Sequence, residues 1–185
     1  MQIIRRPLFY PKLLVALLLL FSFFTLTTKP ATALPAEYSE AITSFDSVIT
    51  INKDTSITIK ETIVYETTQE KHGIFRYIPE YYAEDGYKKH LPISKITVTD
   101  ETGLPIQYEK NSENNSVFLK IGDPYTTFSG EKTYIITYTV ARALDQFDTH
   151  DELYWDITGE GWSMPILTTT ATIVSPYAKM TELVC

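Results

Sequence analysis

Hydrophobic and polar residues alternate along most of the chain beyond residue 44, with the two-residue period of strands that are buried on one face. Isoleucine, valine, threonine and tyrosine dominate these runs, as strands require. The pattern predicts strands at 45–51, 56–66, 74–78, 93–99, 104–108, 117–121, 133–140 and 167–174. Short strands at this spacing, without a long amphipathic helix, predict an all-β fold: an antiparallel β-sandwich of about eight or nine strands spanning residues 45–176.

The segments between these runs have other patterns. Residues 34–44 contain a proline and are predicted to be a linker, and 80–92 and 110–115 are predicted to be polar loops. Residues 141–152 are acidic, with room for a single helical turn.

The stretch Glu152–Ile166 holds both tryptophans of the chain. Leu153, Trp155 and Ile157 alternate as in a half-buried strand, and a glycine-rich turn follows at 159–161. An indole beside such a turn indicates either a corner that closes the core or a rim that contacts a ligand.

The N-terminal segment differs from the rest. Basic residues at Arg5, Arg6 and Lys12 precede an uncharged apolar run at 13–26, and Ala31-Thr32-Ala33 follows. This is the pattern of a secretory signal peptide, here residues 1–33 and helical in its apolar part. The apolar run is shorter than the roughly 20 residues of a membrane-spanning helix, so a retained anchor is the weaker interpretation. We therefore expect an exported protein, located outside the cytoplasm.

The part of the chain beyond residue 33 is acidic. It contains all 23 acidic residues but lacks four of the 16 basic ones, which leaves a net charge of −11. Nucleic acids and anionic lipid surfaces are bound by clustered lysine and arginine, so neither is an expected partner. The single cysteine, Cys185, cannot form a disulfide within this chain.

Two oppositely charged residues fall among apolar alternation, Glu61 and Arg76. A buried carboxylate requires a partner, and a guanidinium can satisfy it with two hydrogen bonds. We hypothesise that the two residues form a structural ion pair across neighbouring strands. The alternative is that each points to solvent through a bulge.

Other candidate sites have weaker signals. The carboxylates of 148–160 suggest a glycoside hydrolase at most, because nothing fixes their separation. Asp145, Asp148 and Asp151 suggest calcium, although the spacing does not match an EF-hand. The histidines are scattered, so we expect no zinc site, no cofactor and no catalytic residues. Aromatic residues give candidates for a ligand-contacting rim: Tyr81, Tyr82, Tyr87, Tyr154 and Trp162.

Two motifs carry a family resemblance. They are Lys71–Pro79, which reads KHGIFRYIP, and Leu153–Ile166, which reads LYWDITGEGWSMPI. With the intervening 121–124 and the glycine and tyrosines of 130–138, they occur in the order shown by the YciQ-like predicted membrane proteins, domain of unknown function 2207. The chain resembles that family from about residue 45 to 176.

The resemblance implies a signal, an extracytoplasmic β-rich domain and then transmembrane helices, and it implies no catalytic residues. This chain has no hydrophobic segment after the domain, so we expect 177–185 to begin a truncated extension. The alternative is a secreted, stand-alone version of the domain that ends at Cys185. The first expectation for function is a non-enzymatic domain that binds, senses or interacts at the cell envelope, with an unknown envelope protein or glycan as partner. A carbohydrate-binding module and an envelope glycoside hydrolase are the alternatives.

Overall fold

The computed structural model describes residues 34–84 and 87–176, and these belong to one compact unit. The expected signal peptide and the expected extension at 177–185 lie outside the described residues. In the described part every regular element is a β-strand, which confirms the all-β prediction. The strands are β1 (Glu40–Ile51), β2 (Ile57–Lys71), β3 (Gly73–Pro79), β4 (Tyr81–Glu84), β5 (Tyr87–His90), β6 (Ile93–Thr99), β7 (Tyr108–Glu113), β8 (Ser116–Gly122), β9 (Phe128–Val140), β10 (Leu144–Gln146), β11 (Asp151–Leu153) and β12 (Thr169–Val174).

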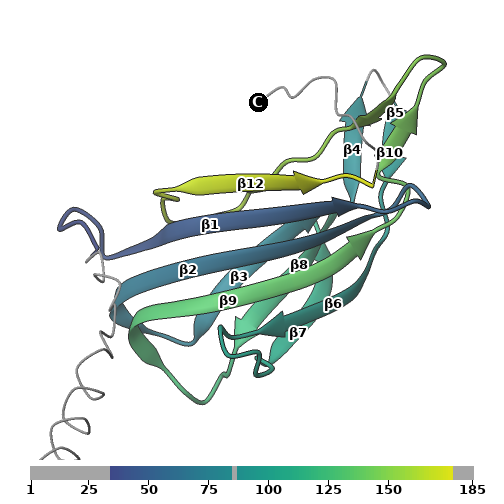
Figure 1. Ribbon diagram of the computed structural model, residues 1–185. Helices are drawn as coiled ribbons and strands as arrows, with labels where there is room; N and C mark the ends of the chain where they lie inside the picture. Colours follow the sequence, from purple (N-terminus) through teal and green to yellow (C-terminus); the bar gives the residue numbers. More distant parts are fainter. Residues whose placement is uncertain (1–33, 85–86, 177–185) are drawn as a thin grey trace, which may run out of the picture. The chain divides into compact units, whose positions relative to one another are not determined.

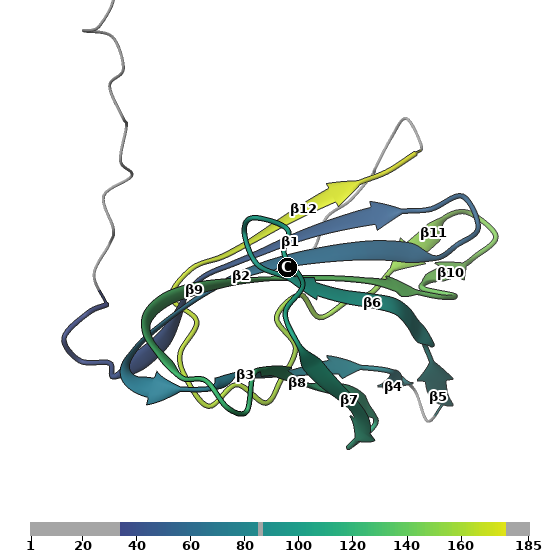
Figure 2. The same cartoon turned by 90° about the horizontal axis from the view of Figure 1, so that it is seen from below.

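Two sheets form the layers of a sandwich, as Figure 2 shows from the edge. The larger sheet has the order β12-β1-β2-β9-β6, and the smaller has the order β3-β8-β7. Two hairpins, β4–β5 and β10–β11, lie at the same end of the sandwich (Figure 1). Eight strands therefore form the sandwich, as predicted, and four short strands are added to it.

Alternation along the strands builds the core between the two sheets. The larger sheet contributes buried residues such as Ile59 and Ile136, and the smaller sheet contributes Ile78 and Leu119. Each is fully or almost fully excluded from solvent, and each such side chain stabilises the fold by about 1.5–3 kcal/mol. The core therefore forms where the inner faces of the two sheets pack together, at positions that the alternation of hydrophobic and polar residues predicted to be buried.

One strand pair departs from the predicted antiparallel arrangement. β12 lies parallel to β1, with Phe45 opposite Thr169 and Thr50 opposite Val174. A parallel pair cannot be joined by a tight turn. The chain reaches β12 by the long segment 154–168, which runs from the β10–β11 hairpin to the side of β1 that does not face β2 (Figure 1).

Several local predictions were wrong. The linker at 34–44 is partly strand, because β1 begins at Glu40; a bulge between Ile42 and Ser44 breaks the alternation there. The loop predicted at 80–92 is the β4–β5 hairpin. The loop predicted at 110–115 is mostly β7. Nearly all side chains of β7 are exposed, so its sequence lacks the alternating apolar residues by which a strand is predicted.

Three further predictions were wrong. Residues 104–108 do not form the expected hairpin with 93–99; only an isolated bridge joins Thr99 to Pro105, and β7 pairs with β8 instead. The predicted helical turn in 141–152 is the β10–β11 hairpin. The strand expected to run through Trp155 stops at Leu153, and the residues beyond it pack on the core without strand pairing.

Candidate functional site

The structure brings Glu61 and Arg76 together inside the sandwich. Glu61 lies on the inner face of β2, and Arg76 lies on the inner face of β3 in the opposite sheet. Arg76 Nε donates to Glu61 Oε2 at 2.9 Å, and Nη2 donates to Oε1 at 2.7 Å. Both side chains have 0% exposure. The pair is therefore a two-bond clamp between the layers, and it is closed to solvent.

Two further partners complete the hydrogen bonding of the pair. The hydroxyl of Tyr138, on β9 beside β2, donates to Glu61 Oε1 at 2.6 Å. Arg76 Nη1 donates to the carbonyl oxygen of Tyr77 at 2.6 Å. A buried charge is tolerated only when it is paired and hydrogen-bonded, and here both charges meet that requirement.

The surroundings shift the pKa values of two of these groups. Burial of Arg76 disfavours its charged form, but the charge of Glu61 and its hydrogen bonds outweigh this and raise the pKa of Arg76 above its ordinary value. Burial raises the pKa of Tyr138 well above its ordinary value, and the neighbouring Glu61 charge raises it further. The guanidinium therefore stays charged and the phenol stays protonated at any physiological pH.

The stretch 154–166 closes this cluster from the side. The guanidinium carbon of Arg76 lies 5.6 Å from the ring centroid of Phe45 and 5.5 Å from that of Trp162. The two rings meet edge to face at 6.1 Å, and Trp162 Nε1 donates to the carbonyl oxygen of Thr158 at 2.9 Å. Trp162, a candidate for the ligand rim, is half-buried and closes the core over the ion pair.

The backbone of Gly159 lies close to the cluster. It has a φ of 65°, and a Cβ added there would stand 2.5 Å from Arg76 Nη1 and 3.2 Å from the carbonyl oxygen of Tyr77. Only glycine accepts that conformation and that proximity without strain. The glycine-rich turn seen in the sequence is thus required by the buried arginine.

The tyrosines of the expected rim are spread over the hairpin end. Tyr154 is 64% exposed, and its ring meets that of Tyr82 edge to face at 5.7 Å. Tyr82 in turn contacts Trp155, which contacts Tyr138 at 6.4 Å. A continuous row of aromatic rings therefore leads from the surface to the buried cluster. Tyr87 begins β5, and its side chain is not among those described.

Tyr81 lies apart from that row. Its ring stacks on His90 at 4.4 Å, and Lys88 Nζ lies 4.3 Å from its centroid. Tyr81 borders a shallow groove of about 210 Å³ that is otherwise lined by Glu80 and residues 112–116. Tyr81 is therefore a rim candidate that lines a surface depression.

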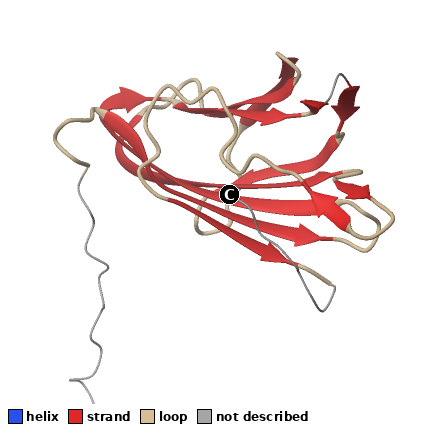
Figure 3. Ribbon diagram, turned by 90° about the horizontal axis from the view of Figure 1, so that it is seen from above, coloured by secondary structure: helices blue, strands red, loops and turns tan. Residues whose placement is uncertain are grey.

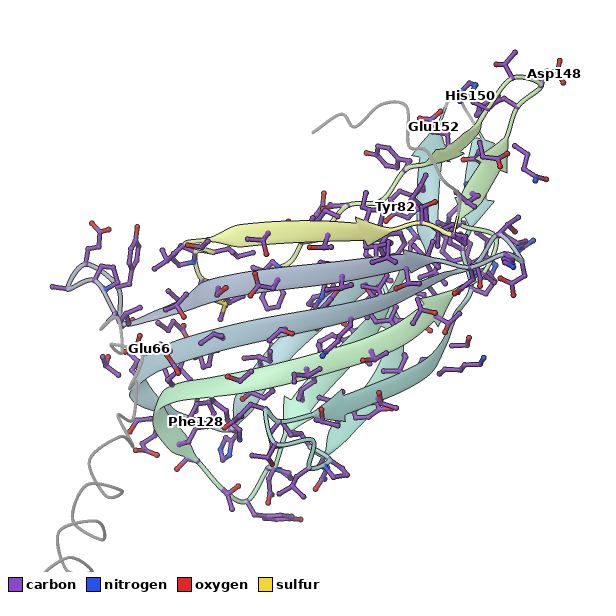
Figure 4. The ribbon with its side chains drawn as sticks, in the orientation of Figure 1. Glu66, Tyr82, Phe128, Asp148, His150 and Glu152 are labelled. Atoms are coloured by element: carbon purple, nitrogen blue, oxygen red, sulfur yellow. The ribbon has the colours of Figure 1, made fainter. Side chains whose placement is uncertain are left out.

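The acidic residues do not assemble around a common point. Asp145 pairs with Lys89 Nζ at 2.6 Å, and Asp156 accepts a hydrogen bond from the amide of Gly159 at 2.9 Å. Asp148 lies at the exposed tip of the β10–β11 hairpin, and Asp151 begins β11 (Figure 4). Within residues 34–84 and 87–176, no three histidine, cysteine or acidic side chains are placed to hold a metal ion. The geometry gives no support to the calcium alternative.

Sequence reasoning missed Tyr138, Phe45 and Gly159 as members of the cluster. A signal for Tyr138 was available, because it alternates with Tyr134 and Ile136 on the inner face of β9. Its position beside Glu61 depends on the register between β2 and β9, in which Glu61 lies opposite Ile136. That register is not readable from either strand alone.

Fold and cluster together define a class of protein: an all-β sandwich domain whose layers are joined by a buried ion pair. In the part of the chain that the structure describes, no helix is long and apolar enough to cross a membrane. The family model "Predicted membrane protein (DUF2207) N-terminal domain" matches residues 41–183, and the chain belongs to that family. This confirms the resemblance found in the sequence.

One curated relative is the uncharacterized protein YciQ of Escherichia coli K12, which is 29% identical over 136 residues. That match covers 71% of this chain and 21% of YciQ, so the chain spans about a fifth of its relative. Among solved structures, native yeast LTA4 hydrolase matches with a TM-score of 0.48 and 14% identity, over 77% of this chain and 24% of that one. An M1 zinc metallopeptidase from Deinococcus radiodurans matches with a TM-score of 0.38 and 7% identity, over 56% of this chain and 21% of its own. Structural likeness at this level carries no functional inference.

Proposed function

We propose that this domain is a non-enzymatic, extracytoplasmic part of a membrane protein, and that it acts at the cell envelope by binding or sensing a partner. One observation carries the proposal: the charged cluster of Glu61, Arg76 and Tyr138 is fully buried and satisfied internally. A reaction centre must admit its substrate to its charged groups, and this cluster admits none. What remains for function is the surface.

The location rests on two independent supports. The basic segment, apolar run and Ala31-Thr32-Ala33 at the N-terminus follow the pattern of a secretory signal. Membership of a family of predicted membrane proteins supports a location beside a membrane. The acidic character of the part beyond residue 33 fits a domain that stays in solution near anionic lipid rather than one that lies on it.

A fusion experiment tests the location. Alkaline phosphatase, which is active only after export, is fused after Pro176, and the same fusion with Leu18→Arg and Leu19→Arg serves as the control. We expect activity from the first fusion and none from the second, because the two arginines interrupt the apolar run. An inactive parent fusion that is nevertheless produced in full would refute export.

A turnover experiment tests the absence of catalysis. The purified chain is incubated with ester, peptide and glycan substrates, with and without calcium and zinc, alongside Asp156→Asn and Asp148→Asn. We expect no turnover by any of the three. Activity that one of these substitutions abolishes would establish the hydrolase alternative in place of our proposal.

The groove beside Tyr81 favours a second candidate, a carbohydrate-binding module. An aromatic ring next to carboxylate and amide groups is suited to sugar binding, and Glu80, Glu113 and Asn114 line the same groove. A glycan array probed with the parent chain and with Tyr81→Ala distinguishes the two candidates. Tyr125→Ala is the control, since Tyr125 is 93% exposed and does not line the groove. Specific glycan binding that is lost in Tyr81→Ala and kept in Tyr125→Ala would support the carbohydrate-binding module.

A further inference from the structure

The free edge of β12 differs from the other sheet edges of the domain. β12 ends the larger sheet, pairs with β1 on one side, and has no described strand on the other (Figures 1 and 3). Its six residues, TTATIV, include no charge and no proline, and Val174 is 46% exposed. An exposed, uncharged edge of β-branched residues is a template for pairing with another strand.

The other edges carry the features that prevent such pairing. β6 has a register shift between Ser94 and Thr97 and a positive φ of 54° at Lys95, and residues 104–106 cover part of its edge. β7 carries exposed charges at Glu109 and Glu113. The outer side of β3 is approached by Gly159, which lies beside the carbonyl of Tyr77. Among the described strands of the two sheets, β12 is the edge without protection.

The hydrogen-bonding groups of this edge define what can occupy it. The amide of Phe45 donates to the carbonyl oxygen of Thr168, so the alternate residues of β12 turn toward β1. The amide and carbonyl groups of Thr169, Ala171 and Ile173 are therefore directed to the free side. Another extended backbone matches such a row of donors and acceptors.

The distribution of charge along the chain indicates which partner can pair with the free edge of β12. Residues 161–178, which contain β12, form a run of 18 without a charged residue in a chain of which 21% is charged. Beyond residue 33 the chain has a net charge of −11, so two copies repel each other over most of their surfaces. They can approach closely only where charge is absent, and the same strand on each copy provides matching threonine pairs.

We propose that β12 pairs antiparallel with β12 of a second copy of this chain, so that two five-stranded sheets become one continuous sheet. A twofold axis pairs identical edges with each other, which is the commonest symmetry of homodimers. The pairing supplies about six backbone hydrogen bonds. It adds a partner to the binding role proposed above and does not depend on export.

Such an interface is small, and the dimer is correspondingly weak in solution. A six-residue edge buries less than the roughly 1,200 Å² of standard interfaces, so we expect a dissociation constant of ~10–100 μM. Two copies attached to one membrane meet at a much higher effective concentration, and the same contact then suffices.

Sedimentation velocity over a range of concentrations tests the proposal with matched substitutions. Thr172→Lys places a charge on the unprotected edge, and Thr97→Lys places the same charge on an exposed threonine of β6, at the opposite edge of the same sheet. We expect Thr172→Lys to weaken the dimer about fivefold or more, since a twofold axis brings the two lysines together, and Thr97→Lys to have no effect. A parent chain that stays monomeric throughout, or equal effects of the two substitutions, would overturn the proposal.

Cysteine cross-linking gives a second measurement in a Cys185→Ser background. Under mild oxidation Ala171→Cys is expected to form a disulfide-linked dimer, whereas Ser94→Cys on β6 is expected to remain a monomer. Melting temperatures close to that of the parent chain show that the variants are folded. Cross-linking of Ser94→Cys alone would assign the contact to the other edge. Failure of both measurements would leave the phosphatase and turnover results unaffected.

Discussion

The ion pair between the layers gives the most specific prediction. Arg76→Met and Glu61→Gln are made singly and together, and the free energy of unfolding of each variant is measured. Arg76→Met leaves the Glu61 carboxylate buried with Tyr138 as its remaining described hydrogen-bond partner. Glu61→Gln leaves the guanidinium without a counter-charge, beside a neutral amide and the Tyr77 carbonyl. Each single change should cost about 3–5 kcal/mol, because it strands a charge that has no access to water.

The free energy of unfolding of the double variant measures the coupling between the two charges. Removing both charges removes the stranded charge, so the double loss should be smaller than the sum of the single losses by about 2–4 kcal/mol. Urea unfolding followed by tryptophan fluorescence is the assay, because Trp162 lies against Arg76 and reports on this region directly. A domain of this size has about 5–15 kcal/mol of stability in total, so the single variants are measurable.

The exposed pair Lys89–Asp145 is the internal control. Its atoms are as close, at 2.6 Å, but its side chains are 28% and 37% exposed. The same cycle with Lys89→Met and Asp145→Asn should give a coupling below about 1 kcal/mol. Additive losses at Glu61 and Arg76, or equal coupling in the two pairs, would refute the argument that burial makes the inner pair strong.

Three further predictions follow from described contacts. Gly159→Ala should destabilise the fold by about 2 kcal/mol or more, and Gly103→Ala by about 1, because both have positive φ but only Gly159 lies against Arg76; equal melting temperatures would contradict this. Burial and the charge of Glu61 raise the pKa of Tyr138. The contribution of Tyr138 to stability is therefore fully present below the ordinary tyrosine pKa of about 10 and falls as the pH rises beyond it. Tyr138→Phe should reduce this loss of stability at alkaline pH, and an unchanged dependence of stability on pH would contradict the assignment to Tyr138. Burial would raise the pKa of Glu40, but hydrogen bonds from Tyr65 and Lys71 lower it below its ordinary value. The contribution of Glu40 to stability is therefore present above about pH 4.3 and is lost as the pH falls. The parent chain should be more stable than Glu40→Gln at neutral pH, and this difference should disappear in an acid titration; a difference that persists at low pH would contradict the cause.

Alternation predicted the fold well wherever a strand has one buried and one exposed face. β2, β8 and β9 follow the two-residue period closely, and they form the centre of the structure. β7 has no buried face to speak of, and its pairing depends on the Asn114–Asn115 turn rather than on burial. Propensity and period carry no information about such a strand.

The candidate site was predictable in part. Two charges at buried positions must be matched, and that rule alone suggested that Glu61 and Arg76 belong together. It could not show that Tyr138 completes the cluster, or that Trp162 covers it, since those contacts depend on strand register and on an irregular segment. The aromatic residues could likewise be identified as candidates from the sequence, but their contacts with one another could not be predicted from it.

The parallel pairing of β1 with β12 has a consequence for the order of folding. A chain that leaves a narrow channel N-terminus first releases β1 and β2 early, and these can form their hairpin at once. The other neighbour of β1 arrives only with residues 169–174, after nearly the whole domain has emerged. Contacts between residues so distant in sequence form slowly. The larger sheet is therefore complete only after β12 has emerged, and until then the side of β1 that β12 will occupy has no partner strand.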